Sequence, residues 1–143
     1  MKEKIKILEF KIEIKSAIPV YEQIKEAIKY HIISETLVPG DQLMSIRDMA
    51  SKTKIHPNTI AKVYSQLESE GFVYSKPGKG YFVKSDKRKI SKEKTRTFKK
   101  LVRDFLLKST TLGFSMNEIY NELKGIENER ESKDREGDND NNK

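Results

Sequence analysis

The chain has 143 residues, of which 36% are charged and 35% hydrophobic, and its formal net charge is +7. This length accommodates one ordinary domain with a small appendage. The absence of cysteine excludes disulfides and thiolate metal sites, and neither a signal peptide nor an apolar run near the ~18 residues of a membrane span is present, so we expect a cytoplasmic protein without membrane partners.

Residues 1–17 are predicted to form an N-terminal strand or extended arm, because β-branched and charged residues alternate between positions 4 and 14. A helix is predicted to open at Pro19, where a proline loses no backbone hydrogen bond. Apolar residues recur at helical spacing up to Ile32, and the sequence of residues 38–41 is typical of a turn.

Two short helices are predicted next. Ser45 fits the N-cap of the first, with Asp48 in capping-box spacing, and this helix should end near residues 52–54. The second should begin after His56, with Pro57 at its first position, and stop at Gly71. Its apolar face is Ile60, Val63, Tyr64 and Leu67, and its opposite face is Asn58, Ala61, Lys62, Ser65 and Ser69.

A β-hairpin follows these helices, since residues 72–76 and 81–84 have strand character on either side of the turn 77–80. Two helices with a tight turn and then a hairpin make the order of a winged helix-turn-helix, whose second helix enters the DNA major groove. We therefore predict a mainly α fold with a small β-hairpin wing, over residues 18–84.

Ten residues of this domain are candidate DNA contacts. Arg47 is placed to grip a phosphate together with the backbone N–H groups of its helix. Asn58 can bind adenine through two hydrogen bonds, and Lys62 can reach guanine or a phosphate. Lys79, between two glycines, can approach the minor groove or the DNA backbone. The full set is Ser45, Arg47, His56, Pro57, Asn58, Thr59, Lys62, Ser65, Lys79 and Gly80.

Each candidate also has a plainer interpretation, as a helix cap, a turn residue or a solvated surface side chain. Tyr64 and Tyr81 could stack on bases, but core packing is the better interpretation at their positions. His31 lies on an apolar helix face and is interpreted as a packed histidine. No spacing of ligand-type residues suggests a metal site, and no cofactor is expected.

Residues 85–126 are predicted to form a short α-helical dimerisation segment. Two amphipathic helices of this length cannot bury their apolar faces alone, so a second chain should cover them. Residues 127–143 contain no apolar side chain and are predicted to be a disordered acidic tail. The candidate dimerisation residues are Phe98, Leu101, Val102, Phe105, Leu106, Ile119 and Leu123.

The net charge of the whole chain hides a strong asymmetry. Residues 127–143 have a net charge of −3, so residues 1–126 carry +10. Residues 76–103 alone hold twelve Lys or Arg against two acids. Such a basic segment fits a polyanionic partner, although solvated surface lysines would give the same count.

The segment 18–83 resembles the N-terminal DNA-binding domain of GntR-type bacterial transcription regulators. The matching pieces are residues 18–24, 38–43, 45–50, 67–73 and 78–83, and residues 57–59 with the pair Val63-Tyr64 are similar to the YtrA-type branch. The resemblance implies DNA contacts from Arg47, residues 56–59, Lys79 and Gly80. Met44 stands where the family usually has proline, and Ala61 stands where many members carry a basic base-reading residue.

These observations predict a sequence-specific transcription regulator, a dimeric repressor that reads a palindromic operator in double-stranded DNA with residues 57–70 in the major groove. The alternative is a non-specific basic nucleic-acid-binding protein, which salt and competitor DNA would distinguish. An enzyme is not expected, because the chain lacks a phosphate-binding loop or a nucleophile–base pattern. Residues 84–126 are too few to enclose a conventional ligand pocket, and the existence of a small-molecule effector is left open.

Overall fold

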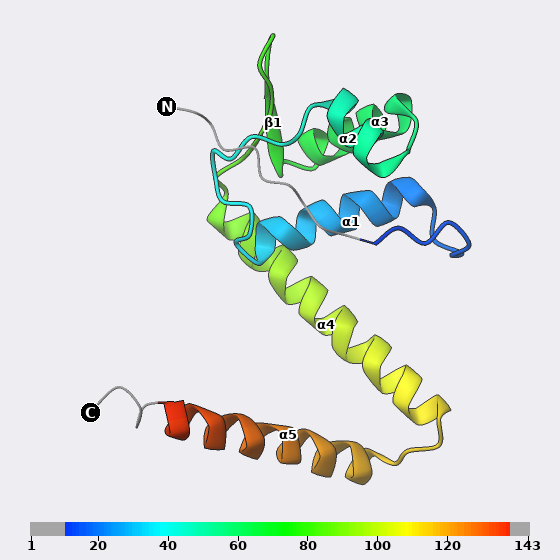
Figure 1. The fold of residues 1–143 in the computed structure, drawn as a ribbon, viewed down its shortest axis with the longest axis vertical. Helices are drawn as coiled ribbons and strands as arrows, with labels where there is room; N and C mark the ends of the chain where they lie inside the picture. The colour runs from blue at the N-terminus through cyan, green and yellow to red at the C-terminus, as the bar shows by residue number, and fades with distance from the viewer. Residues whose placement is uncertain (1–10, 138–143) are drawn as a thin grey trace. The chain divides into compact units, whose positions relative to one another are not determined.

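The computed structural model describes residues 11–137, which fall into two compact units, one ending at Thr97 and the other beginning at Phe98. The first unit contains α1 (Val20–Ile33), α2 (Ile46–Thr53), α3 (Pro57–Ser69), β1 (Val73–Lys76), β2 (Gly80–Val83) and the start of α4 (Lys87–Thr111). The second contains the rest of α4 and α5 (Met116–Gly137) (Figure 1). The predicted order of helices and hairpin is therefore confirmed.

The core of the first unit lies where α1 and α2 pack against α3. Ile24 and Ile28 of α1 and Ile60 and Leu67 of α3 are fully buried, as the predicted apolar face of α3 requires. Each such side chain stabilises the fold by about 1.5–3 kcal/mol relative to an exposed one. The core therefore fixes the face of α3 that points to solvent.

The hairpin is built on a tight turn and covered along one edge. The Lys79 N–H donates to the Lys76 carbonyl (3.0 Å), and Gly78 has φ 72°, as the third residue of a type II turn requires. Leu43 donates from its N–H to the Tyr81 carbonyl (2.9 Å), and Gln42 forms a β-bridge with Phe82. The segment before α2 thus pairs with β2, while the hairpin tip extends away from the three helices (Figure 1).

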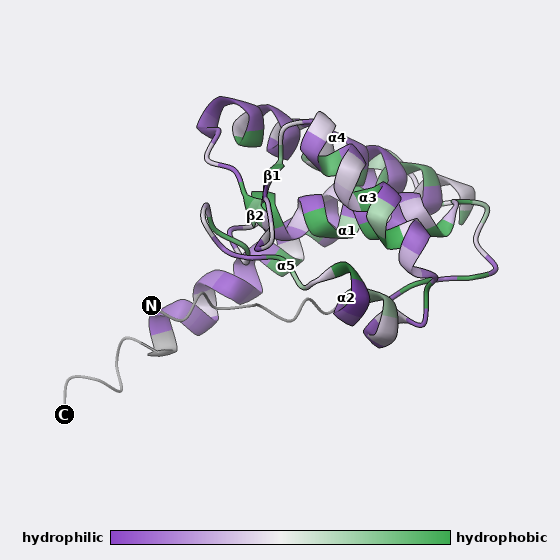
Figure 2. Ribbon diagram, turned by 90° about the horizontal axis from the view of Figure 1, so that it is seen from above, coloured by the Kyte–Doolittle hydropathy of each residue, from purple (hydrophilic) through white to green (hydrophobic). Residues whose placement is uncertain are grey.

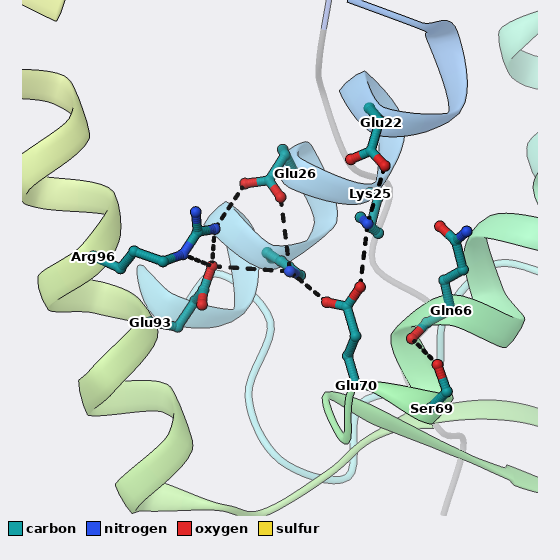
Figure 3. Close-up of polar contacts among 9 residues, drawn as sticks. Glu22, Lys25, Glu26, Gln66, Ser69, Glu70, Glu93 and Arg96 are labelled. Carbon is teal, nitrogen blue, oxygen red and sulfur yellow. Dashed lines mark hydrogen bonds and ion pairs between the residues drawn. The ribbon is translucent and has the colours of Figure 1, made fainter.

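A cluster of charged side chains joins α1, the end of α3 and the start of α4 (Figure 3). Lys29 Nζ lies 2.5 Å from a Glu70 carboxylate oxygen and 3.9 Å from one of Glu93, and Lys25 Nζ lies 3.1 Å from Glu70. Arg96 pairs with Glu93 and, at 3.4 Å, with Glu26. We call these residues, with Glu22 beside Lys25, the α1–α3–α4 ion cluster.

The ion cluster shifts the pKa values of its members in the directions that its charges demand. Burial would raise the pKa of Glu70, but hydrogen bonds from Lys29 and Lys25 outweigh it and lower that pKa. The hydrogen bond from Arg96 lowers the pKa of Glu93. Burial opposes the charged form of Lys25, yet its bonds to Glu70 and Glu22 raise its pKa. These shifts keep Glu70, Glu93 and Lys25 charged near neutral pH.

The N-terminal strand prediction is wrong for the residues that the structure describes, and the rest of residues 1–17 lies outside them. Residues 11–19 form turns and irregular backbone, with no strand. The side-chain amide of Gln23 binds this segment: it accepts from the Glu13 N–H (2.9 Å) and donates to the Glu13 carbonyl (2.9 Å) and the Ile18 carbonyl (2.8 Å). The Gln23 side chain thus makes hydrogen bonds to this backbone that a neighbouring strand would otherwise make.

In the second unit, Gly113 (φ 92°) lies in the connection between α4 and α5, and Ser115 directly precedes α5. The Ser115 hydroxyl accepts from the Glu118 N–H (3.2 Å), and a Glu118 carboxylate oxygen accepts from the Ser115 N–H (2.8 Å), a complete capping box. The backbone N–H of Ser115 lowers the pKa of Glu118.

The prediction of a disordered tail from residue 127 is wrong for residues 127–137, which continue α5. Residues 138–143 lie outside the described part of the chain. The sequence from Glu127 is rich in helix-forming charged residues, and Arg135 lies 4.0 Å from Glu131 one turn earlier. These last turns are hydrophilic (Figure 2), so local helix propensity rather than burial explains the extension.

Candidate nucleic-acid interface

The N-terminus of α2 presents Arg47 to solvent, as predicted. Ser45 is the N-cap, and its hydroxyl oxygen accepts a hydrogen bond from the Asp48 N–H (3.0 Å). Because the oxygen is the acceptor, the hydroxyl hydrogen remains available to donate to an anion. An exposed guanidinium, a hydroxyl donor and the positive end of a helix together can bind a phosphate.

The N-terminus of α3 is capped by His56, with Pro57 at the first helical position, as the sequence predicts. His56 Nδ1 accepts from the Asn58 N–H at 3.1 Å. In the neutral ring the proton therefore sits on Nε2, which can donate to a phosphate while Nδ1 holds the cap. His56 and Asn58 are exposed, and Thr59 is half-buried, so Thr59 contributes more to the start of the helix.

The solvent face of α3 carries Asn58, Lys62 and Ser65, all exposed, whereas Ala61 is half-buried. The Lys62 ammonium lies 4.1 Å from the centre of the Tyr21 ring on α1. This cation–π contact places the lysine on the α1 side of the face. Asn58, Ser65 and, at the end of the helix, Ser69 are the other exposed polar side chains of this face.

The tip of the hairpin presents Lys79 to solvent, and the wing is held from the segment before α2. Gln42 Nε2 donates to the Lys79 carbonyl at 2.6 Å. Gly80 has φ 108°, and a Cβ there would lie 3.3 Å from Gln42 Nε2, so only glycine allows this approach without strain.

Residues 42–44 link the three parts of the candidate interface. Gln42 binds the wing tip, Leu43 pairs with β2, and the Met44 carbonyl accepts from the Tyr64 hydroxyl of α3 at 2.8 Å. Ser45, the cap of α2, follows directly. The N-terminus of α2, the helix α3 and the wing are therefore fixed to one another by three consecutive residues.

The two tyrosines of this region belong to the core, as predicted. Tyr64 is fully buried, and its burial raises its pKa. Tyr81 is half-buried and packs edge-to-face on Tyr64, with 5.1 Å between ring centres.

His31 is half-buried, consistent with a packed histidine, and the described residues hold no group of three His, Cys, Asp or Glu that could bind a metal ion. None of the described helices has the length and hydropathy needed to cross a membrane.

The candidate dimerisation residues all lie in the second unit, and they divide into two kinds. Ile119 is buried (6% exposed) within the unit, and Leu106 is half-buried. Phe98 (65%), Leu101 (55%) and Leu123 (49%) remain largely exposed. Further apolar residues of this unit, absent from the predicted set, are also exposed: Leu107, Leu112, Phe114, Met116, Tyr120 and Ile126.

Sequence reasoning missed two features near this interface. One is the α1–α3–α4 ion cluster, for which the only local signal is the pair Lys25 and Lys29 beside the apolar positions Ile24 and Ile28. The other is the attachment of residues 11–18 by Gln23, for which no local pattern exists. Both depend on contacts between elements rather than on the order of residues along the chain.

The sequence and the fold of this chain are both similar to those of known proteins. Residues 20–83 match the model of the bacterial regulatory proteins, gntR family. The uncharacterized HTH-type transcriptional regulator YhcF of Bacillus subtilis is 32% identical over 78% of this chain and 93% of its own length. The HTH-type transcriptional repressor YtrA of the same organism is 28% identical, covering 80% of this chain and 89% of that protein. The solved structure of YtrA from Sulfolobus acidocaldarius, a GntR-family transcription factor, has 32% identity and a TM-score of 0.52, covering 84% of this chain and 97% of that one.

Proposed function

Because this chain belongs to the GntR family of bacterial regulatory proteins, with relatives of the YtrA type, and is a DNA-binding transcription regulator, we propose that it is a dimeric repressor of its own promoter region. The repressor role follows the printed description of the Bacillus YtrA protein. Repression would occur by occlusion of the promoter, in the cytoplasm where bacterial DNA lies.

The solvent face of α3 carries this proposal. Its opposite face is fully buried in the core, so the exposed side chains of the solvent face, Asn58, Lys62 and Ser65 in its first three turns, are those that α3 would bring to the major groove. Asn58 is the residue best suited to read adenine, since Ala61 offers no hydrogen bond. Arg47, Ser45 and His56 would position the helix by binding phosphates on either side of the groove.

The wing would bind the DNA beside the major groove that receives α3. Lys79 supplies the charge, and the positive φ of Gly80 allows the backbone to approach closely. The bond from Gln42 to the Lys79 carbonyl holds the tip in place before DNA arrives. Such preorganisation lowers the entropic cost of binding.

A second copy of this chain is the proposed cover for the apolar face of the second unit. Leu101 and Phe105, which lie about one turn apart on α4, and Leu123 of α5 remain between 44% and 55% exposed, so both helices present large apolar side chains to solvent. Two identical faces in contact generate twofold symmetry, which matches a palindromic operator with half-sites about one helical turn, or ~10 bp, apart.

Footprinting tests this function. The purified full chain is bound to the DNA upstream of its own coding sequence in the presence of excess scrambled duplex at physiological salt. We expect protection of one palindromic site that overlaps the promoter. Uniform coating of the DNA with no protected site would instead support the non-specific alternative.

A further inference from the structure

A basic groove lies beside the turn that leads into α3, and one of its two sides comes from residues before the segment 20–83 that the family model matches. It is lined by residues from two stretches of the first unit: Lys11, Ile12, Ile14, Lys52, Thr53, Lys54 and Ile55. Three of the seven are lysines, and none is acidic. The groove therefore has a positive charge on an apolar floor.

The N-terminal side of the basic groove is held firmly. Ile12 packs against the hydrophobic core, and the Gln23 amide makes two hydrogen bonds with the backbone of Glu13 and a third with Ile18. Lys11 is exposed next to these anchored residues. The packing of Ile12 and the hydrogen bonds of Gln23 therefore fix the backbone next to Lys11.

The other side of the groove is continuous with the DNA-reading helix. Lys54 follows α2 in the left-handed conformation (φ 57°), and its N–H caps α2 by donating to the Ala50 carbonyl. Only Ile55 separates Lys54 from His56, the cap of α3. Lys54 is exposed and lies two residues before the cap of the helix that we propose to enter the major groove.

We propose that the basic groove binds a phosphate of the operator DNA, with Lys11 and Lys54 as its principal ligands and Lys52 beside them. The proposal rests on the proposed function, and it extends the DNA interface from residues 20–83 to the N-terminal arm. Charge complementarity and continuity with the α3 N-terminus favour DNA over a free anionic ligand. Residues 11–18 then act as a fixed clamp on the DNA backbone.

The test measures the salt dependence of binding for the full chain, by fluorescence anisotropy with the footprinted duplex and a scrambled duplex of equal length. Lys11→Gln and Lys54→Gln should each lower the slope of log K against log salt by about 1. One lost phosphate contact should weaken binding about fivefold at 0.15 M salt, equally for both duplexes. Lys133→Gln on α5 is the control with the same change of charge.

Gln23→Ala separates anchoring from charge, because it changes no charge yet removes three hydrogen bonds to the arm. Lys11→Gln should then have a smaller effect in the Gln23→Ala background than in the native chain. Unchanged slopes for both Lys11→Gln and Lys54→Gln would overturn the proposal, and competition by inorganic phosphate alone, with no change of slope, would indicate a free-anion site. Arg47→Ala distinguishes this failure from a failure of the proposed function, since it should still abolish operator binding.

Discussion

The hydroxyl of Tyr64 donates a hydrogen bond to the carbonyl of Met44, 2.8 Å away. Tyr64 is fully buried at the middle of α3, and Met44 is the last residue before the cap of α2. Met44 also occupies the position at which the family usually has proline. One buried hydrogen bond therefore fixes the start of α2 relative to the helix that reads DNA.

Replacement of Tyr64 by phenylalanine tests this bond. Tyr64→Phe keeps the buried ring but leaves the Met44 carbonyl without its partner, so the free energy of unfolding should fall by about 1–3 kcal/mol. Operator affinity should also fall, because α2 and Arg47 lose a fixed position. Urea unfolding and anisotropy measure the two effects, and Tyr30→Phe, at an exposed position on α1, is the control that should change neither.

His56 is expected to combine a structural and a functional role. His56→Ala removes the side-chain cap of α3 and should cost about 1 kcal/mol of stability. His56→Ser keeps a cap, but its short side chain holds its donor at the cap and not at the position of Nε2, so it should restore stability without restoring operator affinity. Urea unfolding and anisotropy are compared for both variants. Recovery of full affinity by the serine variant would show that the imidazole is only a cap.

The ion cluster predicts a specific dependence of stability on pH. Glu70 has a lowered pKa in the folded chain, so its contribution is complete above the unfolded value of about 4.3 and is lost as the pH falls through the lower folded value. Glu70→Gln should therefore lower the free energy of unfolding by about 1–3 kcal/mol at pH 7 and by much less near pH 2.

Urea unfolding at a series of pH values measures this difference. Glu68→Gln, an exposed carboxylate two residues earlier on α3, is the matched control and should leave the curve of the native chain unchanged. A constant difference between Glu70→Gln and the native chain across the whole pH range would show that the charge of Glu70 is not the cause.

The apolar face of the second unit predicts a dimer that a single charge disrupts. Leu101→Glu places a carboxylate among Phe98, Val102 and Phe105, which share its face of α4, and should convert the dimer to monomer. Leu107→Glu introduces the same carboxylate on the opposite face, where Leu107 is 67% exposed, and should leave the dimer intact. Light scattering at micromolar concentration distinguishes them. A native chain that is already monomeric at this concentration would rule out the dimer.

The features that sequence reasoning predicted are those set by local chemistry. Ser45 and His56 are caps that use residues two or three positions away, and the buried face of α3 follows from the helical spacing of its apolar residues. The contacts of Lys25 with Glu70 span 45 residues, so the spacing of neither residue reveals them.

Two errors of the sequence prediction have physical causes. The alternating pattern up to Ile14 indicates a strand, but within the described residues the Gln23 amide binds the backbone of Glu13 instead. The segment from Glu127 has no apolar residues, which indicates disorder, although its charged side chains are good helix formers and continue α5 to Gly137. The candidate contacts with DNA remain predictions, because their partner is not part of the chain.

The preference for operator over scrambled duplex, measured by competition at physiological salt, tests the central claim most directly. The native chain should prefer the operator by about 10³-fold or more. Asn58→Ala should reduce this preference by about 10- to 100-fold with little change in scrambled binding, whereas Lys79→Ala should weaken binding to both duplexes. An unchanged preference in Asn58→Ala, or a native chain with no preference, would contradict the assignment of α3 as the element that reads the sequence.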